Sequence, residues 1–399
     1  MATYSNFSTD FFQVSVIADE LTAGLPDAFS DRAIGFLICD SQVDYDELLV
    51  ILKQKINFPV IGGTTFTDPL TGANEERSAT LTVLDLEQLD YSIQISEPLQ
   101  QDLCEQQMEQ LYENCVRGLT GPPKMLMMYM PMIPGLTVDH FVTRLIGLTG
   151  ETPLFGGMNM NDLDSTKAAV FAGGEAYRDR MVLIALGGGI RPVFGVGSQM
   201  TPMSEYAPAV TESDYNVVYR LDDMSFCDYM RSVGISPEDR RNGVDALVQY
   251  GPLPCQLRNK LAEDDGIAEL RCISYTNVEA GSAAFSSSLP LGTRVNMGLI
   301  QKDDVADSFR SCMDTLQQRM AKETETGYEY SVLFAVPCVA RYFAMLGGEN
   351  LESRLLLAET PGHLAVSAYY GFLEVGPTLG HKGEVHNRSH NASIVMCAI

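Results

Sequence analysis

The sequence predicts an α/β (α+β) protein in which duplicated strand-helix-hairpin units form packed, largely antiparallel sheets flanked by helices. Hydrophobic residues make up 45% of the 399 positions, which is enough for a well-buried core. Short apolar runs alternate along the chain with stretches of helical periodicity, and two stretches repeat the same order of elements. We therefore expect an internal duplication, and we predict the helices and strands one repeat unit at a time.

The first unit starts at an apolar strand over residues 34–38 and reaches the pair Gly62-Gly63. Between them lies a helix whose apolar side chains recur at helical spacing, namely Leu48, Leu49, Ile51 and Leu52. A polar loop follows the glycines, and a further apolar strand is expected over residues 79–84.

The second unit repeats this order, beginning with an apolar strand over residues 125–129. Its helix carries the apolar residues Phe141, Val142, Leu145 and Ile146. Gly156-Gly157 follows 94 positions after the first glycine pair, and strands are expected over 168–171 and 181–186. The matching order predicts two copies of one α/β unit.

A third, weaker copy closes the chain, with strands over 332–336, 364–372 and 394–397 and a helix over 342–357. A fourth copy is expected to start at the strand 294–299, with the amphipathic stretch 305–320 after it. The copies are long and irregularly spaced, which excludes a solenoid and indicates duplication within one chain.

The domain boundary is placed near residues 214–223, where a Gly-rich strand pair gives way to a polar segment that contains proline. We expect an N-terminal helical segment over 1–28, an N-terminal domain over 29–216 and a C-terminal domain over 217–399.

Composition excludes several classes of protein. A formal charge of −25 would repel phosphate backbones, so we expect no nucleic-acid partner. The N-terminus lacks the features of a signal peptide, and no apolar run approaches the roughly 20 residues of a membrane span. The nine cysteines include no CxxC pair, which argues against a disulfide framework. We therefore expect a soluble protein of a bacterial-type cytoplasm with no membrane association.

Residues 152–202 resemble the N-terminal domain of the FIST family, whose name stands for F-box and intracellular signal transduction. The resemblance lies in the order of the motifs: proline, Gly156-Gly157, a polar loop, an apolar hairpin and the strand with Gly195 and Gly197. Residues 332–346, 371–377 and 390–393 resemble the C-terminal FIST domain in the same way. Two positions depart from the usual pattern, Pro377 in place of glutamate and Ser393 in place of threonine.

The resemblance implies a sensory domain for a small molecule, either an amino acid or another metabolite. Other members carry the domain attached to kinases, chemoreceptors or cyclases. Here the resemblance covers about residues 30–395, so signalling is expected to pass through a separate partner such as a histidine kinase or a chemoreceptor.

Candidate ligand-binding residues come from the motif positions. They are Gly63, Thr64, Gly157, Asn159, Cys338, Arg341, Glu374 and Asn391. Glycine N–H groups and amide side chains would bind a ligand carboxylate, and Arg341 would hold one with a bidentate fork. Structural alternatives stay open: the glycines permit close strand approach, Arg341 pairs with Glu349 or Glu352, and Cys338 is a buried hydrophobe.

Two other functions remain as alternatives, although no cofactor is expected. Some FIST relatives resemble haem-based gas sensors, and His386 and His390 are spaced to share one helix face, although their surroundings are typical of a loop. A haem or metal site for gas or redox sensing is therefore the first alternative. An enzyme that uses Cys338 as nucleophile is the second alternative. It ranks below the first because the sequence contains no catalytic residue set and no established catalytic motif.

Overall fold

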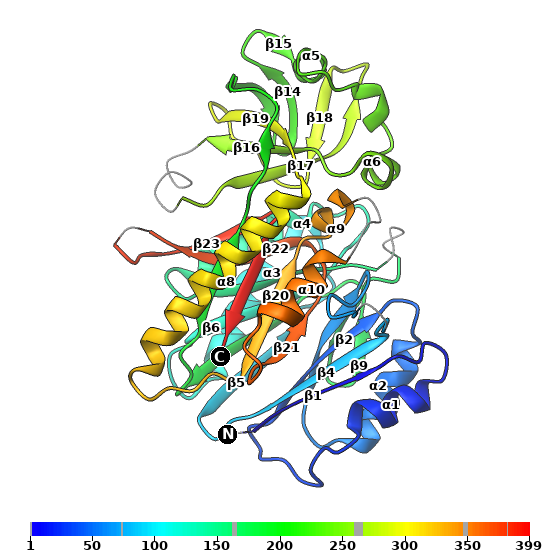
Figure 1. The fold of residues 1–399 in the computed structure, drawn as a ribbon, viewed down its shortest axis with the longest axis vertical. Coiled ribbons are helices and arrows are strands. Elements are labelled where there is room, and N and C mark those ends of the chain that lie inside the picture. The colour runs from blue at the N-terminus through cyan, green and yellow to red at the C-terminus, as the bar shows by residue number, and fades with distance from the viewer. Residues whose placement is uncertain (1, 73–74, 162–165, 259–265, 346–349, 381) are drawn as a thin grey trace.

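A computed structural model describes residues 2–72, 75–161, 166–258, 266–345, 350–380 and 382–399 (Figure 1). It confirms the predicted fold class, because helices flank packed sheets whose strands are mostly antiparallel. Among the helices of these residues, none combines the length and the apolar character that crossing a membrane would require.

The first repeat unit is a parallel strand-helix-strand motif. Strand β2 (Ile34–Asp40), helix α2 (Tyr45–Lys55) and strand β3 (Val60–Thr65) follow in order, and β2 lies parallel to β3. Strand β4 (Ala79–Asp85) pairs antiparallel with the other edge of β2. Asp44 caps α2 by accepting a hydrogen bond from the Glu47 backbone N–H at 3.1 Å, which fixes where the helix begins.

The N-terminal segment is only partly helical, which corrects the prediction for residues 1–28. Helix α1 (Val14–Thr22) is preceded by strand β1 (Ala2–Ser8), which pairs along its whole length with β4. This sheet has the order β1-β4-β2-β3-β8-β9, with β8 (Val170–Ala172) and β9 (Glu175–Tyr177) at its far edge. As an edge strand with polar residues on it, β1 lacks the apolar pattern by which a strand is recognised.

The second unit repeats the first. Strand β6 (Met125–Pro131), helix α4 (Val138–Thr149) and strand β7 (Leu154–Asn159) form a parallel motif, and β10 (Val182–Gly188) pairs antiparallel with β6. Strand β5 (Leu89–Ile95) extends this sheet beyond β10, and helix α3 (Cys104–Arg117) packs against α4.

The same sheet continues into the end of the chain. Strand β22 (Gly371–Leu379) pairs antiparallel with β7, and β23 (Val385–His390) pairs with β22. The sequence predicts one strand over 364–372, but the chain leaves its first sheet after β21 (Ala365–Ala368) and enters this one as β22. Strands from both predicted domains therefore share one sheet.

The third copy has the same topology. Strand β20 (Val332–Pro337) is parallel to β21 and antiparallel to β24 (Ile394–Ala398), as expected for this unit. Two helices, α9 (Val339–Ala344) and α10 (Leu351–Glu359), make the crossover. Strand β11 (Val193–Gly197) joins the sheet beside β24.

The fourth predicted copy is wrong. Strand β19 (Arg294–Leu299) and the long helix α8 (Lys302–Thr324) exist, but β19 pairs antiparallel with β12 and β16 in another sheet. Periodicity identifies a strand and a helix but not the strand's partners.

The sheet that contains β19 forms a separate lobe, which we call the distal lobe (residues 201–299). Its order is β12-β19-β16-β17-β18-β14-β13, with β15 paired to β14. The strands are β12 (Thr201–Pro202), β13 (Val210–Asp214), β14 (Val217–Leu221), β15 (Met224–Ser225), β16 (Pro254–Arg258), β17 (Glu269–Asn277) and β18 (Ser282–Phe285). Helices α5 (Phe226–Ser232) and α6 (Gly243–Tyr250) belong to it. Figure 1 shows this lobe in green and yellow above the remaining residues, which we call the body.

A shared core joins the three repeated units of the body. Phe36 of β2 and Phe334 of β20 make an edge-to-face contact at 4.7 Å between ring centroids, and Phe155 of β7 lies 6.5 Å from Phe334. All three side chains are buried in one cluster with residues of β24. The body therefore folds around residues from both ends of the chain.

Candidate functional site

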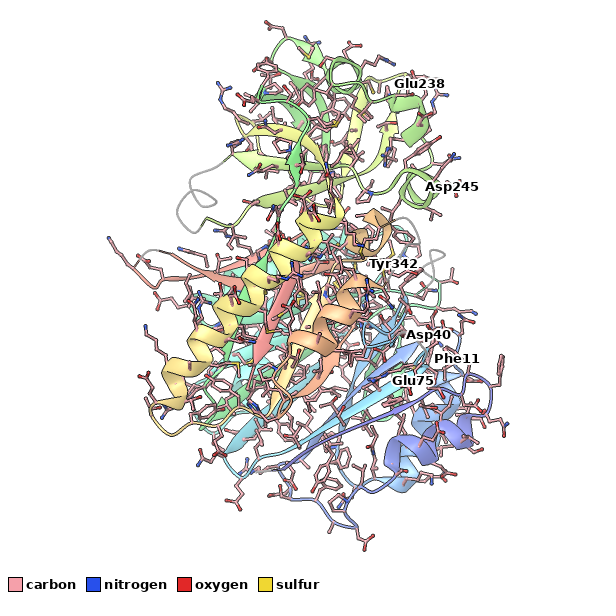
Figure 2. All side chains as sticks on the ribbon, viewed as in Figure 1. Phe11, Asp40, Glu75, Glu238, Asp245 and Tyr342 are labelled. Carbon is pink, nitrogen blue, oxygen red and sulfur yellow. The ribbon has the colours of Figure 1, made fainter. Side chains whose placement is uncertain are left out.

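A cavity of about 580 Å³ lies where the distal lobe meets the body. The residues before and in the first turn of α4, together with residues 338–340, line it from the body, and α6, β17 and β18 line it from the distal lobe. In Figure 2, Asp245 on α6 lies above Tyr342 on α9 at this junction, and these two helices are in contact. The cavity is thus formed by both parts of the molecule.

Most of the cavity wall is apolar. Aliphatic, thioether and aromatic side chains supply it, among them Met132, Ile133, Leu136, Leu247, Phe285 and Phe372. A cleft of this size with a few polar groups among apolar walls is typical of a site for a small organic molecule.

Asp139, in the first turn of α4, is the buried carboxylate of this wall, with 3% of its surface exposed. Its Oδ2 accepts a hydrogen bond from the Tyr215 hydroxyl at 2.7 Å and a longer one from the Ser288 backbone N–H at 3.3 Å. Its Oδ1 is buried and accepts no hydrogen bond from the described residues. Burial beside the Asp139 carboxylate raises the pKa of Tyr215, which keeps its hydroxyl a donor. Asp139 therefore joins the body to the distal lobe through one oxygen only.

The remaining polar wall consists mainly of amides, hydroxyls and two arginines. Asn391 accepts a hydrogen bond from the Ser286 hydroxyl and donates one from Nδ2 to the His390 carbonyl at 2.8 Å. Arg240 donates to the Gly251 carbonyl at 2.7 Å, whereas Arg241 is exposed. The structure thus places Asn391, a predicted site residue, in the cavity wall.

Cys338, another predicted site residue, also lines the cavity at the end of β20. Burial, reinforced by the Glu374 carboxylate, raises the pKa of the Cys338 thiol well above its ordinary value. A thiol in these surroundings stays protonated at neutral pH, which disfavours it as a nucleophile. The contacts are those of a buried thiol that faces a binding cavity.

Glu374 lies behind Cys338 and is fully buried. Its Oε2 accepts a long hydrogen bond from the Ser393 backbone N–H at 3.5 Å, and its Oε1 has no partner within the described structure. Burial raises the pKa of Glu374 well above that of an ordinary glutamate. Glu374 supports the cavity wall through Cys338 and does not itself line the cavity.

Arg341 donates its hydrogen bonds to other groups of the protein, and it does not line the cavity. Its Nε donates to Glu352 Oε1 at 2.7 Å, and its two Nη atoms donate to the Ser308 hydroxyl and the Val305 carbonyl, each at 2.9 Å. Arg341 and Glu352 are both completely buried. This is the ion-pair alternative for Arg341; Glu349, the other candidate partner, lies outside the described residues.

The four predicted residues near the glycine pairs gather elsewhere, between β3 and β7. Asn159 donates from Nδ2 to the Thr64 carbonyl at 3.0 Å, and the Thr64 hydroxyl accepts from the Ala169 backbone N–H at 3.0 Å. A Cβ on Gly63 would lie 2.6 Å from Asn159 Nδ2, and one on Gly157 would lie 2.6 Å from the Leu373 carbonyl oxygen. These glycines therefore permit close approach within the body, and the cavity does not include them.

The histidines of the alternative haem or metal site lie on strand β23 and not on a helix. Four residues along a strand separate His386 from His390 by about 13 Å, too far to share one ion. His390 is buried and donates from Nε2 to the Gly376 carbonyl at 3.0 Å. No cluster of three or more potential metal-ligating side chains occurs in the part of the chain that the structure describes. The geometry therefore does not favour the pair as ligands of one metal.

Sequence reasoning missed Asp139 and the walls supplied by α6, β17 and β18. An acidic residue in the first turn of a helix is typical of helix capping, so nothing in its pattern distinguishes Asp139 as a site residue. The distal-lobe residues are brought to the body by tertiary packing and leave no local signal.

A family model described as FIST N domain matches residues 33–224. The match covers both of the first two repeat units and the part of the cavity wall that α4 supplies. A search of the curated proteins found no match to the chain. FIST domains are associated with sensing and signal transduction. The C-terminal FIST domain stays a prediction from sequence resemblance.

Proposed function

This chain is a FIST-domain protein, and we propose that it is a sensory ligand-binding module whose cavity between the distal lobe and the body takes a small metabolite, such as an amino acid. It would act in the cytoplasm through a separate output partner, such as a histidine kinase or a chemoreceptor.

The cavity itself carries this proposal. About 580 Å³ of mostly apolar space, with a few converging polar side chains, suits one small organic molecule. Its walls come from the segment matched to the FIST N domain and from residues beyond it, including Cys338 and Asn391. Two of the eight residues proposed from the motifs therefore lie where a ligand would bind.

Signalling follows from the position of the cavity. A ligand that contacts both walls favours the arrangement of lobe and body in which both contacts form, by its differential affinity for that arrangement. The hydrogen bonds from Tyr215 and Ser288 to Asp139 already cross this junction. A change in the junction would alter the surface that an output partner contacts.

A thermal-shift screen tests the proposal, using the full chain with amino acids, small carboxylates and nucleotides. A ligand at a hundredfold excess over its dissociation constant stabilises the native state by about 2.7 kcal/mol. Ala246→Phe, on the α6 face that lines the cavity, should abolish that stabilisation. Val248→Phe is the matched control, because Val248 lies on the same helix and is 47% exposed.

Two outcomes would contradict the proposal. One is a ligand that stabilises Ala246→Phe as well as the wild type, which would place its site elsewhere. The other is chemical turnover of the bound molecule, which would favour the enzyme alternative. An absorption spectrum of the purified protein checks the haem alternative in the same sample.

A further inference from the structure

We propose that the cavity recognises a cationic hydrogen-bond donor, of the primary ammonium class, through Oδ1 of Asp139. This inference rests on the proposed function and adds to it the chemical class of the ligand's polar end. Three observations support this inference: the cavity, the burial of Asp139, and the difference in hydrogen bonding between its two carboxylate oxygens.

The two oxygens of Asp139 differ in their hydrogen bonding. Oδ2 accepts from the Tyr215 hydroxyl at 2.7 Å and from the Ser288 N–H at 3.3 Å. Asp139 as a residue lines the cavity and is 3% exposed, and no described residue donates to its Oδ1. A buried acceptor without a donor costs free energy that a bound ligand would recover.

The surroundings favour a positively charged donor over a neutral one. Asp139 lies in the first turn of the 12-residue helix α4, where the helix dipole stabilises negative charge. No lysine or arginine of the described residues forms an ion pair with it. The cavity's own arginines are directed elsewhere: Arg240 to the Gly251 carbonyl and the Tyr250 ring, and Arg241 to the exposed surface. A ligand ammonium would supply the missing counter-charge.

The apolar walls determine the rest of the ligand. Side chains such as Leu136, Leu247 and Phe285 line the same cavity as Asp139, so the body of the ligand is hydrocarbon-like. The ligand class is therefore an amphipathic amine. Oδ2 of the same carboxylate accepts hydrogen bonds from the distal lobe. An amine bound to Oδ1 would therefore lie at the contact that joins the lobe to the body.

Three probes of equal length test this class on the full-length protein by calorimetry at neutral pH: n-hexylamine, 1-hexanol and hexanoate. A hydrogen bond between charged groups predicts that the amine binds at least about tenfold more tightly than the alcohol. Hexanoate should bind most weakly. In Asp139→Asn, the preference for the amine over the alcohol should fall to within about twofold, with little change in the affinity of the alcohol.

Asp304→Asn is the matched control, because Asp304 is also a buried aspartate, 4% exposed, in the first turn of a helix. It accepts hydrogen bonds from the Gln301 N–H and the Thr201 hydroxyl and lies outside the cavity. This variant should keep the wild-type order of probes. It also separates specific binding from general attraction of amines to a chain of formal charge −25.

Several results would overturn the inference: equal binding of the three probes, tightest binding of hexanoate, or an amine preference that survives Asp139→Asn. If Asp139→Asn does not fold, two other measurements test the inference. They are the relative affinities of the three probes for the wild type and the loss of amine binding in Ala246→Phe. Failure of every probe also overturns it. The proposed function fails separately, when no molecule of the wider screen is blocked by Ala246→Phe.

Discussion

Arg341 and Glu352 show how a single pair of residues can be structural where the sequence suggests ligand binding. Both side chains are fully buried, and Arg341 donates to three protein acceptors. The sequence motif suggested that Arg341 would hold a ligand carboxylate with a bidentate fork. The sequence did contain the alternative, because Glu352 follows on the next predicted helix, but only the packing decides between them.

Removing one partner of this pair should be strongly destabilising. Arg341→Ala leaves the Glu352 carboxylate buried without its cation, and we expect a loss of about 3–5 kcal/mol in the free energy of unfolding. Arg310→Ala is the control, because its ion pair with Glu359 lies at the surface, with side chains 52% and 30% exposed, and it should cost at most about 1 kcal/mol. Urea unfolding measures both. Similar losses in the two variants would mean that burial of the Arg341 pair has no special cost.

His390 predicts a second effect at the residue scale, on the dependence of stability on pH. Burial lowers the pKa of His390 from 6.5 to about 4. Between these two values the unfolded chain binds the proton and the folded protein does not, so stability falls as pH decreases from about 6.5 to about 4. The imidazole accounts for about 3 kcal/mol of this loss.

Urea unfolding of His390→Gln between pH 4 and 7 checks the effect. Glutamine can still donate to the Gly376 carbonyl but has no proton to gain, so the decrease of stability toward acid should become shallower. His386→Gln, on the same strand, is the control and should follow the wild type. An unchanged slope in His390→Gln would contradict the assignment of acid sensitivity to this residue.

At the scale of elements, β3 and β7 are the equivalent strands of the first two repeat units, and their glycines explain why the duplication is visible in the sequence. Gly62 and Gly156 have φ values of +141° and +134° and occupy equivalent positions beside the preceding parallel strand. A Cβ would lie 1.9 Å from the Leu37 oxygen at Gly62 and 2.1 Å from the Met128 oxygen at Gly156. The backbone geometry requires glycine at both places, which confirms the structural interpretation of the glycine pairs.

Alanine at either position should therefore destabilise the protein. We expect Gly62→Ala and Gly156→Ala each to cost about 2 kcal/mol or more, because the new methyl group meets a backbone carbonyl in a conformation that favours glycine. Gly147→Ala, within helix α4, is the control: nothing lies within 4 Å of its Cβ, so alanine should stabilise by up to about 1 kcal/mol. Thermal unfolding of the three variants tests this contrast, and a tolerated Gly156→Ala would refute it.

Local patterns predicted three of the repeated units because each carries its own signal: an apolar strand, an amphipathic helix and, in two of them, a glycine pair. They did not predict β1, whose pairing with β4 depends on sheet-edge hydrogen bonds and not on an apolar pattern. They also could not bring Asp139 to Tyr215, 76 positions away. Half of the cavity wall comes from the distal lobe, and that placement is a property of the assembled molecule.

At the scale of the whole molecule, the body is built from both ends of the chain. Strand β22 completes the sheet of β7, and β24 pairs with β11, so the segment that matches the FIST N domain has its edges covered by residues beyond position 330. The division into domains over 29–216 and 217–399 remains a prediction from the sequence. In the fold, they share one hydrophobic cluster that contains Phe36, Phe155 and Phe334.

A fragment of residues 1–224 should therefore fail to fold independently. It would expose the face that packs on Phe334 and leave strand edges at β7 and β11 unpaired, which favours aggregation. We expect strong binding of a hydrophobic dye, rapid proteolysis and no cooperative thermal transition, because the lost contacts belong to its own core. Co-expression with residues 225–399 should restore a single transition close to that of the full chain. A monomeric fragment 1–224 that unfolds cooperatively would show instead that the sequence boundary is also a boundary of folding, and that the C-terminal strands dock onto a finished domain.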